Sequence, residues 1–271
     1  NIYVAGGTLQ IGNGGATGIL GTGTPLFPQT GATLAFNTTN ATEYNPGVIN
    51  GGGAIWFMPG NGLTTLLDDD NGNFIGNLIL DSGKIKIRGN NNALGGVRDA
   101  VTVGGAGILS AAGSTQSFGN LISFSQGATL MAEANGATNT AATFSGRLDF
   151  NNTTAAGFTI TTQTNQALTL SGVIKGSAGF TKTGNGTLTL SAQNFFDGVG
   201  TLSGQIVVTG GLVNIGNARS LGSYGVGNET IIQSGATLDL RGQALNVADD
   251  ASAAREIIQI SGNGYLGFGA L

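Results

Sequence analysis

The sequence predicts an all-β fold, a right-handed parallel β-helix (β-solenoid) of roughly 11–13 coils with irregular loop insertions. Three observations support this prediction. Glycine accounts for 50 of 271 residues and charged residues for only 9%, a balance that disfavours helices and suits short strands joined by turns. Hydrophobic residues reach 40%, which is enough for a continuous core. A strand–glycine–strand unit also recurs along the chain, as in stacked coils.

The first recurring unit is a strand, a corner that contains glycine, and a second strand. Apolar and polar residues alternate on both sides of the corner, as they do in strands with one buried face. Copies of this unit occupy residues 3–13, 79–89 and 207–217. Their separations differ, which indicates loops of unequal length between coils; a β-solenoid tolerates such loops, and a propeller of fixed blades generally does not.

A second unit ends in Gly-Ala-Thr-Leu and occurs in residues 29–34, 126–130 and 233–238. We expect Leu34, Leu130 and Leu238 of this unit to point inward on different coils. Segments this short stack well only if each coil hydrogen-bonds to the next, at about 20–25 residues per coil. A meander of hairpins stays open as an alternative, because Asn61-Gly62 and Asn71-Gly72 are hairpin-type dipeptides.

The chain is expected to form a single β-helix over residues 1–271, as a piece of a longer protein. No linker divides it. Residues 135–154 are rich in Asn, Ala and Thr and are the expected loop excursion. The sequence contains no apolar run of about 18 residues, so we expect no membrane span in this segment.

Charge and composition restrict the function. The net charge is −4 and only ten residues are Lys or Arg, which argues against nucleic acid as a partner. The chain has no His and no Cys, which excludes Ser-His-Asp and Cys-His catalysis and metal sites that use those ligands. We therefore expect no enzyme activity, no catalytic residues and no cofactor.

An acidic run at Asp68 to Asp70 is the one candidate for a metal or catalytic site. Its oxygens could gather a hard cation such as Ca²⁺, with Asp68 and Asp70 as candidate ligands, or begin the carboxylate pair of a carbohydrate-active enzyme. The spacing does not match the Asp-x-Asp-x-Asp-Gly calcium loop or the nonapeptide calcium repeat. An exposed acidic turn is the favoured interpretation.

A cationic strand face is a candidate contact for an acidic glycan. Lys84, Lys86 and Arg88 fall on one face of the predicted strand, while Ile85 and Ile87 fall on the other. The favoured interpretation is a solvated outer face over a buried aliphatic one.

Two aromatic residues, Tyr44 and Trp56, lie in a less repetitive region and are candidates for stacking on sugar rings. Inward packing of these rings is the favoured interpretation.

Residues 171–215 carry the most specific pattern. A Ser-Gly-x-Ile-x-Gly opening begins at Ser171, and Phe180-Thr-Lys182 leads into Gly-x-Gly-Thr-Leu-Thr-Leu, which ends at Leu190. An Asn-x-Phe-x-Gly turn and a Val-x-x-Gly-x-Leu-x-x-Ile close follow. This stretch closely resembles the autotransporter-associated β-strand repeat, also called the passenger-associated transport repeat. It departs from the family in the insertion at residues 199–204, and only one full copy is evident.

The resemblance implies a passenger of type V secretion, a β-helix outside the cell on the surface of a Gram-negative bacterium. Its expected role is structural or adhesive, with a host or neighbouring-cell surface, a matrix or a glycan as partner. Two alternatives stay open. One is a self-assembling subunit of an extracellular filament or surface layer, joined head to tail, because neither terminus shows a polar cap. The other is a carbohydrate-active β-helix enzyme that uses Asp68 to Asp70.

Overall fold

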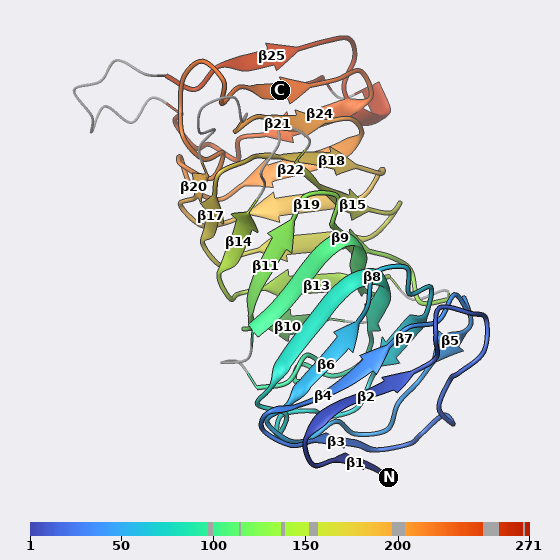
Figure 1. Ribbon diagram of the computed structural model, residues 1–271. Helices are drawn as coiled ribbons and strands as arrows, with labels where there is room; N and C mark the ends of the chain where they lie inside the picture. The colour runs from blue at the N-terminus through green and yellow to red at the C-terminus, as the bar shows by residue number, and fades with distance from the viewer. Residues whose placement is uncertain are drawn as a thin grey trace.

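The computed structural model describes residues 1–96, 100–113, 115–136, 139–151, 157–196, 204–245, 255–267 and 269–271. Over these residues the chain forms a β-solenoid of about 10 turns, with its coils stacked in chain order from the N-terminal to the C-terminal end (Figure 1). The described strand pairs run parallel. The predicted parallel β-helix is therefore confirmed, and the hairpin meander is not the fold.

The number of turns is slightly below the predicted 11–13. Hydrogen bonds between neighbouring coils join residues 20 to 30 positions apart, so several coils are longer than the expected 20–25 residues.

The strands form three stacks. The first stack holds β2 (Gly7–Ile11), β4 (Ala32–Phe36), β6 (Ala54–Phe57), β11 (Leu121–Ser125), β14 (Leu148–Asn151), β17 (Ile174–Gly176) and β20 (Phe195–Phe196). The second stack holds β5 (Glu43–Tyr44), β7 (Thr64–Leu67), β12 (Thr129–Ala132), β15 (Phe158–Thr162), β18 (Phe180–Thr183), β21 (Ile206–Val208), β23 (Thr230–Ile232) and β25 (Ile258–Ile260). The third stack holds β10 (Gln116–Phe118), β13 (Ala141–Phe144), β16 (Ala167–Leu170), β19 (Thr187–Leu190), β22 (Gly211–Ile215) and β24 (Ala236–Asp239).

The remaining elements lie at a corner or near the ends of the solenoid. β8 (Asn77–Ile87) and β9 (Ala100–Ala111) belong to both the first and the second stack, because each strand continues through the corner between them. Their mutual register shifts between Leu80 and Ser82, as at a β-bulge, which bends a strand. β1 (Ile2–Val4) pairs with β3 (Leu26–Pro28), and a short 3₁₀ segment spans Tyr265–Gly267.

The core runs inside the stacked coils. Burial alternates along the strands, as in β15 and β19, because successive side chains of a strand point to opposite faces. Leu34, Leu130 and Leu238 are all 0% exposed, which confirms their predicted inward direction. Aromatic rings also stack from coil to coil; the centroids of Phe124 and Phe158 are 5.1 Å apart, with nearly parallel planes.

Buried asparagines complete the hydrogen bonding at some corners. The side chain of Asn71 accepts from the backbone N–H of Ile49 at 2.7 Å and donates to the carbonyl of Ala93 at 2.8 Å. Asn194 accepts from the N–H of Ile174 at 2.9 Å and donates to the carbonyl of Ser220 at 2.7 Å. Each amide thus joins the preceding coil to the following coil and satisfies backbone groups that lack a strand partner.

The loop excursion expected over residues 135–154 is wrong for most of that segment. β13 and β14 lie inside it, and they pair with the coils on both sides. Residues 137–138 and 152–154 lie outside the described residues. Composition misled the prediction because the inward positions Phe144, Leu148 and Phe150 suffice to hold two polar strands in the stack.

Candidate functional site

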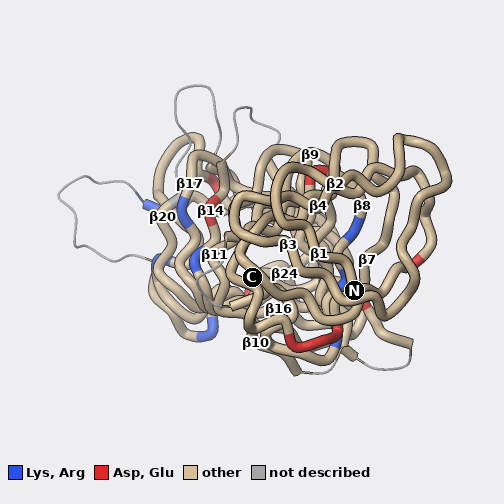
Figure 2. Tube along the Cα trace, turned by 60° about the horizontal axis from the view of Figure 1, so that its bottom comes forward, with Lys and Arg blue, Asp and Glu red and all other residues tan. Residues whose placement is uncertain are grey.

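The cationic face on β8 has the predicted orientation. Ile85 and Ile87 are 0% exposed, whereas Lys84, Lys86 and Arg88 retain partial exposure. Elsewhere in the part of the chain that the structure describes, charged residues are sparse and scattered along the coils (Figure 2). The alternation therefore gives a buried aliphatic face and an outer cationic face.

Each of these cations is paired with an acid from another coil. Lys84 Nζ lies 2.6 Å from Glu133 Oε2, and the other carboxylate oxygen of Glu133 accepts from Ser110 at 2.9 Å. Lys86 lies 3.6 Å from Glu43. Arg88 forms the third pair, described below. The face is an ionic ladder whose charges are neutralised by acids one or two coils away, and its contact with an acidic glycan stays a prediction.

The acidic run follows β7, which ends at Leu67. Asp68 accepts from Arg88 at 2.9 Å and from Asn45 at 3.1 Å. Asp70 accepts from the backbone N–H of Gly72 and from Asn92, both at 3.0 Å. The two carboxylates have separate partners, and the part of the chain that the structure describes contains no cluster of three His, Cys, Asp or Glu side chains placed to hold a metal ion.

The two aromatic candidates differ in position. Trp56 lies partly exposed on β6, and its indole N–H donates to Asp81 at 2.7 Å. Tyr44 is 2% exposed and packs against Phe36, and burial raises the pKa of its phenol to about 12. In β5 Glu43 points outward and Tyr44 inward, so Tyr44 packs inward, which is the favoured interpretation, and the stacking of sugar rings on the alternative candidate, Trp56, stays a prediction.

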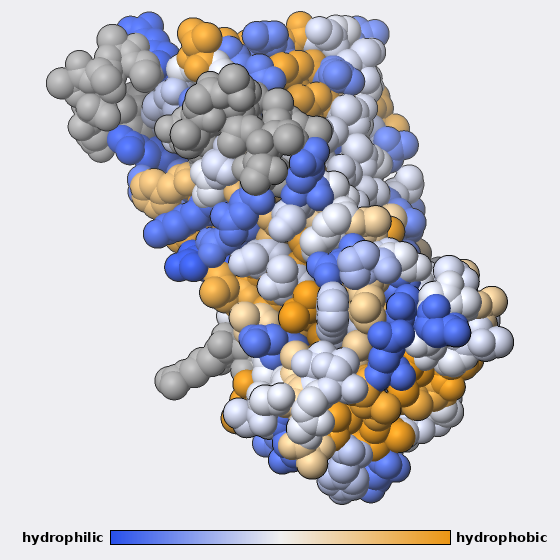
Figure 3. All heavy atoms as spheres, viewed as in Figure 1, coloured by the Kyte–Doolittle hydropathy of each residue, from blue (hydrophilic) through white to orange (hydrophobic). Residues whose placement is uncertain are grey.

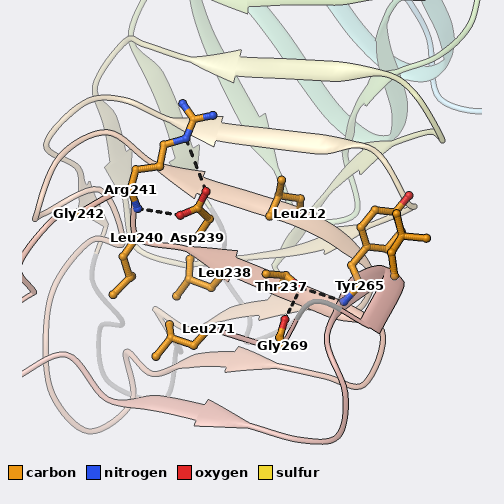
Figure 4. Close-up of a pocket in the computed structure, with 11 residues that line it drawn as sticks. Leu212, Thr237, Leu238, Asp239, Leu240, Arg241, Gly242, Tyr265, Gly269 and Leu271 are labelled. Carbon is orange, nitrogen blue, oxygen red and sulfur yellow. Dashed lines mark hydrogen bonds and ion pairs between the residues drawn. The ribbon is translucent and has the colours of Figure 1, made fainter.

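A hollow of about 640 Å³ lies on the last coil of the third stack. Its lining is mostly apolar, with Leu212, Leu240 and Leu271 around it and the Asp239–Arg241 ion pair at its rim (Figure 4). Apolar hollows of this size suit an apolar ligand or a further polypeptide segment. No sequence pattern marks this hollow, because its residues come from three separate segments of the chain.

A buried lysine, Lys182, is the most unusual polar group. Its side chain is 0% exposed, and its ammonium donates to the carbonyls of Gly184, Gly186 and Gly210 at 2.6, 3.2 and 2.8 Å. Burial lowers its pKa from 10.5 to about 7. In the sequence Lys182 stands out only as part of a repeat, although strict alternation places it on the inward face with Phe180.

Glu256 is a second partly buried ionisable group. One carboxylate oxygen accepts from the hydroxyl of Thr230 at 2.7 Å. Burial, opposed by this hydrogen bond and assisted by the nearby charge of Glu229, raises the pKa of Glu256 to about 7. In the described residues neither Glu256 nor Lys182 pairs with an opposite charge, so their arrangement is not that of an acid–base pair.

No family model, curated protein or solved structure matches this chain. Within the described residues, no helix has the length and apolar character needed to cross a bilayer. The fold assignment therefore depends on the strand pairing of the chain itself, and the resemblance of residues 171–215 to the autotransporter-associated repeat stays a prediction.

Proposed function

We propose that this chain is a non-catalytic scaffold at the bacterial cell surface, a segment of an autotransporter passenger whose outer faces mediate adhesion or aggregation. The main support for this proposal is that several polar side chains find their partners in other coils of the same chain. Lys84, Asp68 and Trp56 all contact groups in other coils, whereas catalytic groups converge on a common concave site. These polar side chains thus join coils to one another. The broad outer faces of the solenoid are left for contact with a partner.

The first stack is the face that we assign to adhesion. Its outward positions Ser123, Asp149, Lys175 and Phe195 lie in one column of paired residues. Phe195 is 52% exposed, and Arg147 pairs with Asp149 at 2.8 Å. Hydrophilic and hydrophobic side chains are intermixed over this part of the molecule (Figure 3). An exposed ring beside charges of both signs suits a polar partner such as a glycan or a matrix protein.

Array binding tests the proposal. The purified chain should bind at least one glycan or matrix protein on a mixed array, and the double variant Lys175→Ala/Phe195→Ala should reduce that binding by about tenfold or more. Thr181→Ala, on the outer face of the second stack, is the matched control. Absence of any binding would contradict adhesion, and binding that the double variant leaves intact would contradict the assigned face.

Self-assembly is a second candidate, favoured by apolar residues exposed on the outermost coils. Tyr3 is 65% exposed and stacks on Phe27 with 4.5 Å between centroids. Leu266 and Leu271, at the hollow of the last coil, are 74% and 61% exposed. Exposed apolar side chains that lie close together are typical of surfaces that contact another polypeptide. Sedimentation over a wide concentration range tests this candidate, and a monomer at every concentration would contradict it.

A further inference from the structure

An aliphatic column inside the second stack contains one charged residue. Successive coils contribute paired positions that are all 0% exposed: Leu130, Ile160, Lys182, Val208 and Ile232. Lys182 therefore occupies a place where its neighbours above and below are apolar. A buried ammonium without partners is strongly unfavourable, so the groups that bind Lys182 decide whether the coil can form.

Those groups come from two successive corners. The carbonyls of Gly184 and Gly186 belong to the corner between β18 and β19, and the carbonyl of Gly210 belongs to the next corner, between β21 and β22. The ammonium has three N–H donors and meets three acceptors, so its hydrogen-bonding capacity is filled. One side chain thus joins two coils inside the core.

The corner at residues 184–186 requires glycine. A Cβ atom at Gly186 would clash with the carbonyl oxygens of Gln163 and Gln166 in the preceding coil. Gly184 has φ 74°, a left-handed conformation that favours glycine. The backbone of Lys182 takes part as well, because its carbonyl accepts from the N–H of Thr209 at 2.9 Å.

We propose that Lys182 is a corner lock, whose ammonium holds the corner at residues 209–211 onto the corner at residues 184–186. Without it, this junction opens locally while the N-terminal coils stay stacked. Each coil of a solenoid contacts only its neighbours, so local opening at one junction is physically accessible. Burial lowers the pKa of Lys182 to about 7, so above neutral pH the lock is a neutral amine that keeps two N–H donors without the cost of a buried charge.

Hydrogen exchange tests the lock in a variant. Lys182→Met keeps a long apolar side chain and removes the three donors. The amides of Thr209 and Leu212, which bond to Lys182 and Gly186, should exchange about tenfold to a hundredfold faster in Lys182→Met. Ile160→Met, one coil earlier in the same column, is the matched control and should leave these amides unchanged.

The other outcomes of this experiment overturn the lock. Unchanged exchange at Thr209 and Leu212 in Lys182→Met would show that the ammonium holds nothing there. Equally faster exchange in β4 and β6 would show a global effect in place of a local one.

Amine labelling tests the same proposal without a substitution. In the wild-type chain, an amine-reactive ester should modify exposed Lys175 at least about tenfold faster than Lys182, because modification of Lys182 requires the corner to open. Subdenaturing urea should accelerate labelling of Lys182 together with exchange at Leu212. Equal labelling of Lys175 and Lys182 in the absence of urea would overturn the lock.

Discussion

Two regions of the same solenoid are tied together by charge in opposite ways. In the coils around β8, the cations lie on the outer face, and Lys84 reaches Glu133 across the surface. In the coils around β18, one cation, Lys182, lies inside and reaches only backbone carbonyls. The corner between the first and second stacks differs too. β8 runs continuously through this corner, whereas β17 and β18 are separate strands on either side of it.

The comparison indicates where the junctions are sensitive to solution conditions. Outer ion pairs are screened by salt and contribute little. A buried ammonium is hardly screened, and its hydrogen bonds cannot be replaced by water. We therefore expect the coils around β18 to respond to pH and to internal substitutions, and the coils around β8 to respond weakly to salt.

The largest expected effect concerns the pH dependence of Lys182. Its pKa is about 7 in the folded chain and 10.5 when unperturbed, so the folded chain binds this proton more weakly. The free energy of unfolding should therefore rise by a few kcal/mol between about pH 7 and about pH 10.5, a stabilisation that is lost as pH falls through about 7. Its column neighbours Ile160 and Val208 do not titrate.

Urea unfolding across this pH range measures the effect. Lys182→Met removes the titrating group and should flatten the profile, while Lys175→Met, on the outer face, should keep it. Equal slopes for wild type and Lys182→Met would rule out Lys182 as the source.

Removal of a buried asparagine should rank second. Asn194→Ala leaves the N–H of Ile174 and the carbonyl of Ser220 without their partner, so we expect a loss of about 2–4 kcal/mol. Asn71→Ala should lower the free energy of unfolding by a similar amount, because Asn71 joins the coils around β8 in the same way as Asn194 joins the coils around β18. Asn92→Ala, at an exposed turn, is the control for thermal unfolding; a matching loss there would refute the role of burial.

A corner glycine should rank third. A Cβ atom at Gly172 would clash with the carbonyl oxygen of Gly146, and one at Gly76 with that of Gly53. Gly172→Ala and Gly76→Ala should each lower the free energy of unfolding by about 1–3 kcal/mol. Gly6, which has open space around it, supplies the neutral control. Differing costs for Gly172→Ala and Gly76→Ala would show that the two regions differ in their corners as well as in their charges.

The smallest effect should come from the outer ion pair. Lys84→Met, which breaks the contact with Glu133, should cost less than about 1 kcal/mol at low salt and less still at high salt. A double-mutant cycle with Glu133→Gln isolates the pair. A coupling energy that is large and independent of salt would show that the outer ion pair stabilises its coils as strongly as the buried Lys182 does.

Sequence alternation predicted much of this architecture. It placed Ile85 and Ile87 inside and their cationic neighbours outside, and it predicted the buried leucines of the Gly-Ala-Thr-Leu units. Inward packing is also the favoured interpretation for Tyr44, and in β5 Tyr44 does point inward while Glu43 points outward. Prediction from sequence failed at residues 141–151 because polar composition hid strands that are held by their pairing.

The sequence by itself determined the fold class, since short alternating segments separated by glycine bury their apolar side only by stacking. The tertiary structure decided where the charges went. Lysine favours water unless a set of acceptors replaces it, and the three acceptors of Lys182 belong to Gly184, Gly186 and Gly210. Gly210 lies in the next coil, so no local pattern contains the complete site. A lysine is tolerated at an inner position only when successive coils bring their corner carbonyls together.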